Sequence, residues 1–439
     1  MQSGIIIIIF LSLIATLKIV SFIGEHYGLH PEWQRKIIHI SLGILSLVFP
    51  FIFTSVVEVA ILFSLCLITL ILIKSSPKIK NTLGKSLFSV KRSSLGEIFF
   101  MLSIILLFWS TRNNLILYLI PILILTIADT IAALIGIKYG KNTFEVIDTY
   151  KSKEGCIGYF SAAFIITISL LFFLTDTSIL KILLIASLVG ILSTLIEGVS
   201  WYGIDNFFIP ISFYLMLKAF MILENIELFT MLLVLLSLSI AVLIMSKRVH
   251  LNTHALLSTI IILFFFWVTG GFEWFLALFS LLLIHIFLTN IQKDYNRYNI
   301  YAVLSIASSG LFWITALKIF NYIPSYFLFV FSLAIHVQLI LLIRLERHLN
   351  KSPNKLIKFL ASIISIAIFQ FIFFLFYPQP EKTSFYSVTL VLIIFMVNLL
   401  FKSDKDWYSK ERWFKQGLYA IIGSLVGIIP LQLYEVFYG

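Results

Sequence analysis

The chain is built almost entirely from long apolar segments, each close to the length of one membrane crossing. A transmembrane helix needs about 20 apolar residues, and inside a bilayer only a helix or a closed barrel satisfies its own backbone hydrogen bonds. We therefore predict an all-α, polytopic integral membrane protein with about 16 transmembrane helices, with about 15 as the alternative. The expected spans are residues 4–23, 37–54, 56–73, 95–110, 115–137, 155–175, 178–198, 207–223, 228–246, 252–270, 272–290, 299–320, 324–343, 356–377, 385–401 and 416–437.

The composition also excludes an ordinary soluble fold. The chain is 60% hydrophobic and 12% charged, whereas a soluble domain carries about 25% charged residues. Its net charge of +11 would suggest nucleic-acid binding in a soluble protein, but here basic loops beside anionic lipid explain it better. Two cysteines, Cys66 and Cys156, cannot form a disulfide framework, and a structural zinc site is not expected. The first apolar segment lacks the basic start of a signal peptide, so we expect it to remain as a span.

Basic residues gather in every second loop. When the loops are sorted alternately, one set holds 26 of the 32 Lys and Arg residues, the other holds Arg112 and Lys382, and four lie in or beside spans. Cytoplasmic loops of membrane proteins carry such an excess. We therefore expect a multi-pass protein of a bacterial inner membrane, with the basic face cytoplasmic and both termini outside.

The character of the polar residues changes near residues 224–250. Before this seam, polar residues enter the spans and the loops contain Gly, Asp, Glu and Asn, whereas the later loops are mostly Lys, Arg and aromatic. We predict two membrane domains on this basis. Residues 1–223 would carry the chemistry, and residues 224–439 would form about eight helices of unknown role.

Arg35, Lys36 and His39 stand at the mouth of the second expected span, with Gly43 one turn farther along. Residues three and four apart share a face of a helix, so these side chains are expected on one side. Gly43 would let a backbone or a ligand approach closely. The alternative is a basic membrane anchor beside a histidine that extends toward water.

The run Ser93-Ser94-Leu95-Gly96-Glu97 opens the fourth expected span. Ser93 or Ser94 could cap the helix, and Glu97 would favour its positive end. This structural role accounts for the run at least as well as a functional role does.

Asp129 is the sharpest signal, because it lies about two helical turns inside the cytoplasmic end of a span made otherwise of Ile, Leu and Ala. An ionised Asp near the middle of a bilayer costs about 2.5–3.5 kcal/mol, so it needs a partner or a watery cavity. The small residues Ala132, Ala133 and Gly136 would let helices pack closely, which is the structural alternative for that face.

Gly140 and Lys141 end the same segment. The pattern that begins at Gly136 is one residue short of a P-loop and follows a transmembrane helix rather than a strand, so it is not a P-loop. Backbone N–H groups and an ammonium group could nevertheless hold a phosphate there.

Lys151, Ser152, Lys153 and Glu154 stand together before the sixth expected span. Two ammonium groups, a hydroxyl and a carboxylate suit a polyphosphate with its divalent cation, because Mg²⁺ is usually held by one or two carboxylates plus substrate phosphates. The alternative is a solvated loop that caps a helix.

Glu197 lies at the end of the seventh expected span, and Asp205 and Asn206 follow in a loop without Lys or Arg. A loop on this side without basic anchors departs from the usual pattern. Its acids are therefore expected to serve a metal or the cations of a neighbouring cluster.

All five clusters open on the same side under the predicted topology. Their cations could hold phosphates, and their carboxylates could hold a metal or act as a base, which is the inventory for phosphoryl transfer from a cytoplasmic nucleotide. The cations are Arg35, Lys141, Lys151 and Lys153, and the carboxylates are Asp129, Glu154, Glu197 and Asp205.

The motifs, in this order, resemble those of one family of membrane enzymes. They are Arg-Lys-x-x-His, Leu-Gly-Glu, Asp-x-x-Ala-Ala-x-x-Gly-x-x-x-Gly-Lys, Lys-Ser-x-Glu-Gly and Glu followed after seven residues by Asp-Asn-x-x-x-Pro, between residues 31 and 215. In them the chain is similar to the dolichol kinase, phytol kinase and CTP-dependent diacylglycerol kinase family. That family looks related to phosphatidate cytidylyltransferases, whose His-Gly-Gly and Asp-Arg motifs this sequence lacks. Cys156 stands where Ser is common, and Phe99-Phe100-Met101 replaces the usual Tyr-Pro, so the choice of lipid stays open.

The resemblance implies transfer of the γ-phosphate of CTP to a polyprenol, a phytol-like alcohol or diacylglycerol, with Mg²⁺ or another divalent cation. Asp129, Glu154 and Asp205 would be catalytic or metal-handling residues, and Glu197 a further metal ligand. His39 would assist proton removal. The residues expected to bind the nucleotide and its phosphates are Arg35, Lys36, Gly136, Gly140, Lys141, Lys151, Ser152, Lys153 and Asn206.

Two other functions stay open. Nucleotidyl transfer to a phospholipid would release pyrophosphate instead of CDP. A secondary transporter would use intramembrane carboxylates equally well, but it predicts a site near the midplane and interrupted helices in both halves. The acids of this sequence lie near one surface and in the first half. No nucleic-acid partner is expected, and the oligomeric state is open.

Overall fold

The computed structural model describes residues 2–76, 95–111, 114–147, 149–249, 251–288, 298–320, 324–350 and 409–428. The chain forms two compact units, residues 1–233 and 234–439, and each is described by itself. Within the described ranges nearly every element is a helix. The prediction of an all-α membrane protein is confirmed at the level of fold class, whereas the predicted assignment of roles to residues 1–223 and 224–439 stays a prediction.

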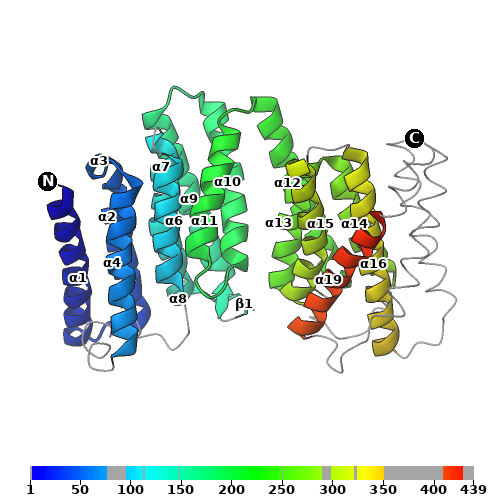
Figure 1. Ribbon diagram of the computed structural model, residues 1–439, viewed down its shortest axis with the longest axis horizontal. Coiled ribbons are helices and arrows are strands. Elements are labelled where there is room, and N and C mark those ends of the chain that lie inside the picture. Colours follow the sequence, from blue (N-terminus) through cyan, green and yellow to red (C-terminus); the bar gives the residue numbers. More distant parts are fainter. Residues whose placement is uncertain are drawn as a thin grey trace. The chain divides into compact units, whose positions relative to one another are not determined.

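The first unit is a bundle of helices that run alternately up and down (Figure 1). Its helices end close to the limits of the predicted spans, because long apolar runs satisfy their backbone only as helices in lipid. Its elements are α1 (Gln2–His26), α2 (Pro31–Leu47), α3 (Phe49–Ile52), α4 (Val56–Ser75), α6 (Gly96–Ser110), α7 (Leu115–Leu123), π-helical η1 (Ile124–Ala128), α8 (Asp129–Tyr139), β1 (Thr143–Glu145), β2 (Tyr150–Ser152), α9 (Lys153–Leu174), α10 (Ile179–Val199) and α11 (Asp205–Phe220).

Among the described residues, nine helices are long and apolar enough to cross a membrane. The helices at the predicted spans 95–110 and 207–223 are shorter, at 15 and 16 residues. The predicted spans 356–377 and 385–401 lie outside the described residues. The structure therefore supports a multi-pass protein. The count of sixteen helices, the cytoplasmic position of the basic face and the outside position of both termini stay predictions.

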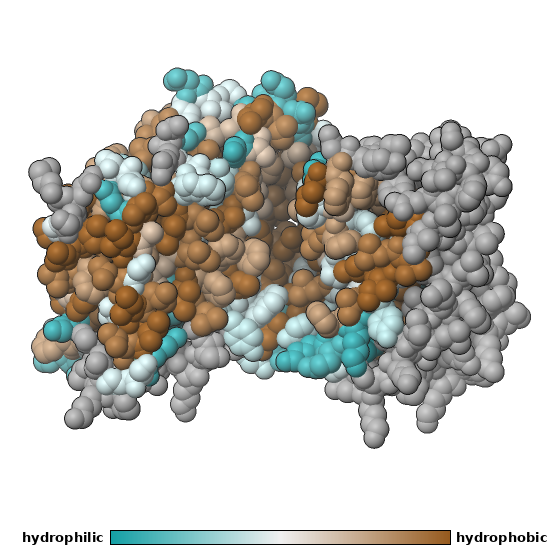
Figure 2. Space-filling model, viewed as in Figure 1, coloured by the Kyte–Doolittle hydropathy of each residue, from teal (hydrophilic) through white to brown (hydrophobic). Residues whose placement is uncertain are grey.

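The surface of the first unit agrees with a position in lipid. On the face that Figure 2 shows, apolar side chains cover the middle of the helices, and hydrophilic residues lie near the helix ends. Large hydrophobic side chains point outward from α1, α4 and α9, among them Phe22, Ile68 and Phe173. Such exposure is unfavourable in water and ordinary against hydrocarbon.

The helix that leads to Asp129 is interrupted by a π-helical turn. α7 contains Pro121, which has no N–H to donate and so removes one helix hydrogen bond. The next residues, Ile124–Ala128, form η1, and regular α-helix resumes at Asp129. Local π adjustments re-satisfy the backbone after a proline within a membrane, and π-turns occur often at functional sites. The interruption sets the direction of Asp129 independently of α7.

A short antiparallel ribbon of β1 and β2 follows α8, where the sequence predicts a loop. Phe144 pairs with Lys151 in the ribbon. The side chain of Ser152 accepts a hydrogen bond of 3.0 Å from the N–H of Gly155 and so caps α9, as the structural alternative for this run predicts. The ribbon thus fixes the direction in which Lys151 leaves the backbone.

Several helix ends and the ribbon gather at one end of the first unit, at the bottom of Figure 1. Two contacts tie α6 to α11 there. The backbone N–H of Leu95 donates to the carbonyl of Tyr202 at 3.2 Å, and the side-chain amide of Asn206 donates to the carbonyl of Gly96 at 2.9 Å. These contacts hold the first turns of both helices beside the end of α10.

The second unit continues the chain from α12 (Asn225–Val249), which begins in the first unit. Gln416 of α19 donates its side-chain amide to Gln338 of α16 at 2.6 Å, and Trp313 of α15 donates its Nε1–H to Ser424 at 2.9 Å. Its remaining described helices are α13 (Thr253–Gly270), α14 (Phe272–Leu288), α15 (Ile300–Phe320), α16 (Pro324–Asn350) and α19 (Lys410–Val426).

Two helix starts differ from the predictions. The predicted caps Ser93 and Ser94 lie outside the described residues, and Leu95 occupies the N-cap position of α6 without a side-chain hydrogen bond. α19 begins at Lys410, before the predicted span. Arg412 is one of the 26 basic residues that the sequence places in the loops of the basic face. It lies inside a helix instead and is 0% exposed, because the helix extends beyond the apolar run.

Candidate active site

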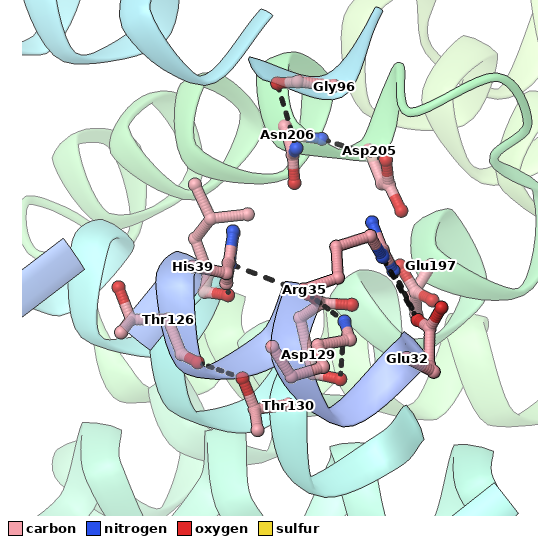
Figure 3. A network of polar contacts seen from close by, with 12 residues as sticks. Glu32, Arg35, His39, Gly96, Thr126, Asp129, Thr130, Glu197, Asp205 and Asn206 are labelled. Atoms are coloured by element: carbon pink, nitrogen blue, oxygen red, sulfur yellow. Dashed lines mark hydrogen bonds and ion pairs between the residues drawn. The ribbon is translucent and has the colours of Figure 1, made fainter. Parts of the chain in front are cut away.

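Three carboxylates from three elements meet at the gathered end of the first unit. Asp129 begins α8, Glu197 lies in the last turn of α10, and Asp205 begins α11. One oxygen of each lies within 4.8 Å of the other two, and Figure 3 shows the three side chains around a common space. One divalent cation could bridge this separation, because carboxylate oxygens lie about 2.0–2.6 Å from Mg²⁺ or Ca²⁺.

Lys36 of α2 neutralises Asp129. Its Nζ lies 2.5 Å from Oδ2 of Asp129 and 3.3 Å from the backbone carbonyl oxygen of the same residue. Lys36 is 3% exposed and Asp129 is 7% exposed. Buried charges in a membrane helix need such a partner. The sequence predicts Lys36 beside a nucleotide, and the structure places it on the central carboxylate of the cluster.

His39 is held between η1 and α6. Its Nε2 lies 3.0 Å from the carbonyl oxygen of Leu125 and 3.5 Å from Oδ2 of Asp129, and its ring meets that of Phe100 edge-on, with centroids 5.3 Å apart. A carbonyl oxygen only accepts hydrogen bonds, so Nε2 carries a proton in this arrangement. The predicted proton removal by His39 would have to use Nδ1.

Lys151 of β2 pairs with Glu197. Its Nζ lies 2.7 Å from Oε1 of Glu197 and also donates to the backbone carbonyl of that residue. Burial opposes the charge of Lys151, but the carboxylates of Glu197 and Asp205 outweigh it and raise the pKa of Lys151 above its ordinary value. Lys151 therefore stays an ammonium at neutral pH.

Arg35 adds a third cation to the site. Its Nη2 and Nε lie 2.5 Å and 3.1 Å from Oε1 of Glu32, and Figure 3 shows the guanidinium on the side of the site where Glu32 and Asp205 lie. Sequence reasoning missed Glu32. Its signal is the three-residue spacing to Arg35 in the first turns of α2, which favours an ion pair on a helix.

The charged groups line one cavity of about 290 Å³. The cavity wall continues over Trp201 and Tyr202. Tyr202 and Gly203 have positive φ angles of 52° and 80°, and a positive φ is uncommon for a residue with a side chain. The tight turn that they form leads directly into Asp205. The charged lining residues are Glu32, Arg35, Lys36, Asp129, Lys151, Glu197 and Asp205.

Small residues bring α8 and α9 together below the cavity. A Cβ atom on Gly155 would lie 2.9 Å from the carbonyl oxygen of Ala132, and one on Gly136 would lie 3.2 Å from Oγ of Ser152. Such residues let membrane helices approach closely. Gly136 and Ser152 line the cavity as predicted. Gly140 contributes to the packing, since a Cβ there would lie 3.0 Å from the side chain of Ser152.

Other predicted site residues do not line the cavity. Glu154 accepts a hydrogen bond of 2.9 Å from the side-chain amide of Asn142, and both of its carboxylate oxygens also accept from the backbone N–H of Asn142. Glu154 therefore connects the start of α9 to the residue before β1. It does not belong to the cluster of three carboxylates. Lys141 and Lys153 are exposed, and Asn206 is used in the contact between α11 and α6.

The carboxylate cluster fits a hard divalent cation. Mg²⁺ prefers oxygen ligands and usually combines one or two carboxylates with substrate phosphates. Oε2 of Glu197 is buried and has no hydrogen-bond partner among the described residues. A buried carboxylate oxygen in that state costs free energy unless something binds it. Asp129, Glu197 and Asp205 would hold the cation, and Arg35, Lys36 and Lys151 lie beside them for phosphate oxygens.

Comparison with curated proteins finds similarity to part of one enzyme. A phytol kinase from Synechocystis sp. is 36% identical over 129 residues, which cover 29% of this chain and 54% of the relative. The chain thus spans about half the length of that relative. No protein-family profile matches the chain, and no solved structure matches it.

Proposed function

We propose that the chain is a lipid-alcohol kinase that transfers the γ-phosphate of CTP to a membrane alcohol at the carboxylate cluster. The observation that carries the proposal is the meeting of Asp129, Glu197 and Asp205 in a cavity that cations also line. Phosphoryl transfer is catalysed mainly by positioning and charge neutralisation, for which this set is suited. The similarity to a phytol kinase supports the same class of reaction.

The residues divide into those for the cation and those for the phosphates. Asp129, Glu197 and Asp205 would hold Mg²⁺, which when bound neutralises charge on the β- and γ-phosphates. The ammonium groups of Lys36 and Lys151 would donate hydrogen bonds to phosphate oxygens in addition to their partner carboxylates. Charge-assisted hydrogen bonds of this kind are stronger than neutral ones.

The proposed reaction is a direct transfer of the γ-phosphoryl group from CTP to the alcohol. The alcohol oxygen bonds to the γ-phosphorus, the bond from that phosphorus to the bridging oxygen breaks, and CDP leaves. The hydroxyl proton passes to a carboxylate of the cluster. Asp205 suits this role best, because Asp129 and Glu197 each form an ion pair with a lysine, and the structure shows none for Asp205 within the ranges it describes.

The test is transfer of label from γ-³²P-CTP, with Mg²⁺, by the purified full chain to polyprenol, phytol and diacylglycerol. We expect a phosphorylated alcohol and CDP, and we expect Asp129→Asn to abolish both. Pyrophosphate in place of CDP would identify nucleotidyl transfer. Absence of any transfer, or undiminished transfer by Asp129→Asn, would contradict the proposal.

A further inference from the structure

A second cavity in the first unit is apolar and elongated. α1, α2, α4 and α6 line it, and its volume is about 80 Å³. Phe63 and Ile73 of α4 both belong to its wall. They lie about 15 Å apart along the helix axis, at a rise of about 1.5 Å per residue. A small volume spread over this length makes the cavity a narrow groove.

The groove and the charged cavity share α2. Ile38 and Leu42 of this helix line the groove, whereas Arg35 and Lys36 line the charged cavity. These two pairs lie on neighbouring faces of one helix, which turns by about 100° per residue. α2 therefore contributes side chains to the walls of both cavities.

Two aromatic rings connect the groove to the cluster. Phe100 belongs to the groove wall, and its ring contacts that of His39 with centroids 5.3 Å apart. Nε2 of His39 lies in turn 3.5 Å from Oδ2 of Asp129. The end of the groove at α6 is thus two side chains away from the carboxylates.

Glu97 supplies a polar group at that end. Among the described residues it is the charged side chain of the groove wall, which is otherwise formed largely by hydrocarbon. It lies in the first turn of α6, next to Gly96, whose carbonyl accepts the hydrogen bond from Asn206. A carboxylate accepts hydrogen bonds from a hydroxyl, and a hydroxyl entering an apolar site needs such a partner.

We propose that this groove binds the hydrocarbon chain of a single-chain lipid alcohol, with the hydroxyl group at Glu97 and directed toward the carboxylate cluster. The inference rests on the proposed function for the reaction that follows, but the binding itself does not require it. We expect the narrow form of the groove to admit one extended chain and to exclude the two chains of diacylglycerol. An isoprenoid alcohol such as phytol has the required form.

Photolabelling of the full chain in detergent, without nucleotide, tests the groove. The probe is a twenty-carbon isoprenoid alcohol that carries a diazirine at its apolar end. We expect labelled peptides from the groove-lining parts of α1, α2 and α4, and an excess of phytol at ten times its Kd should lower this labelling about tenfold. Dioleoylglycerol at the same concentration should leave it unchanged. Labelling of outward-facing residues such as Phe22 and Phe173, undiminished by phytol, would overturn the inference, as would equal competition by dioleoylglycerol.

A matched pair of variants tests the same groove by filling it. Thr69 lines the groove on α4, and Thr230 is exposed on α12. Each donates its hydroxyl to the carbonyl four residues earlier in its helix, at 2.8 Å. Thr69→Phe should lower the competable labelling about tenfold and raise the KM for phytol similarly, with the KM for CTP unchanged, because overfilling a packed site is costly. Thr230→Phe should change neither. Equal effects of the two substitutions would overturn the inference.

The two proposals fail separately. A chain that shows phytol-sensitive labelling of the groove but transfers no phosphate from CTP would uphold the groove and contradict the kinase function. A chain that phosphorylates phytol while its groove stays unlabelled would overturn the groove and leave the kinase function standing.

Discussion

Both units bury charged or polar side chains among apolar helices, but the two units use them differently. In the first unit the charges of both signs converge on one cavity. In the second unit Arg412 is fully buried, with its guanidinium 4.2 Å from the ring centroid of Trp413 and Nη2 at 3.4 Å from the carbonyl oxygen of Leu341. The nearby amide of Gln416 donates to Gln338. These polar groups connect one helix to another.

The charged cavity of the first unit differs in the same way from a cavity of the second unit. The latter is lined almost wholly by apolar side chains such as Leu251, Leu263 and Leu278, whereas seven charged residues line the former. Polar burial alone is therefore compatible with a purely structural role. Carboxylates and cations that meet in one cavity mark the place where chemistry is expected.

Removal of the central carboxylate should give the largest effect. Asp129→Asn should lower the turnover of CTP at least about 10³-fold, because it removes a proposed metal ligand and the partner of Lys36. It also leaves a buried ammonium unpaired, which costs about 3–5 kcal/mol of stability. The double variant Lys36→Met/Asp129→Asn should recover the thermal stability and not the turnover. Recovery of both, or turnover within tenfold of the wild type in the single variant, would contradict the view that the buried charges of the first unit serve chemistry and those of the second serve structure.

Substitution of two glutamates distinguishes residues of the carboxylate cluster from neighbouring residues outside it. Glu197→Gln should lower turnover about 10²-fold, because the oxygen that lacks a protein partner is expected to bind the cation. Glu154→Gln should lower turnover less than about tenfold, because its carboxylate accepts a hydrogen bond from Asn142 and lies apart from the three carboxylates that are proposed to hold the cation. Initial rates at saturating and limiting Mg²⁺ measure both effects. The reverse order would return Glu154 to the metal site that the sequence predicts.

The buried arginine of the second unit should affect stability and not chemistry. Arg412→Met should lower the free energy of unfolding by about 1–3 kcal/mol, through loss of the contact with the Trp413 ring and the hydrogen bond to Leu341. Turnover per folded molecule should stay constant. Thermal unfolding and active-site-normalised rates measure the two quantities. A loss of turnover in the folded variant would show that the second unit contributes to the reaction.

The smallest expected effect concerns pH. The pKa of Lys151 is raised in the folded protein, so its ion pair contributes stability that is fully present below the unfolded pKa of about 10.4 and is lost as the pH rises through the folded value. The difference in unfolding free energy between wild type and Lys151→Met should therefore not shrink between about pH 7 and pH 9.5. A difference that shrinks in that range would mean that the ion pair with Glu197 is weaker than the structure indicates.

The helices could be predicted from the sequence because a long apolar run leaves the backbone few alternatives in a membrane. The ribbon of β1 and β2 could not, since polar and apolar residues alternate only over the four residues 143–146, and so short a run between two apolar segments is equally typical of a loop. The sequence predicts Arg412 in a loop, because a charge beside an apolar run usually marks its end. Its burial depends on Trp413 and α16, and that contact is invisible in one sequence.

The site was partly predictable for an energetic reason. Asp129 and Glu197 stand out because carboxylates inside apolar helix ends are costly unless they are used. Which acids meet depends on the fold. The sequence predicts both Glu154 and Glu197 as metal ligands, yet Glu154 accepts a hydrogen bond from Asn142 and Glu197 pairs with Lys151. Glu32 is not predicted as a site residue, because acidic residues are common at the edge of a membrane and the sequence alone does not show its pairing with Arg35.

The direction of the Asp129 side chain depends on the number of residues in the π-helical turn at Ile124–Ala128. A π-turn holds one residue more than an α-turn needs, and each residue of an α-helix turns the chain by about 100°. Deletion of one residue from this turn would restore a regular helix and rotate Asp129 away from Lys36. Such a chain would keep its hydropathy profile, its span and all its charged side chains. It would look like the same protein by every measure of composition, and its carboxylates would no longer meet.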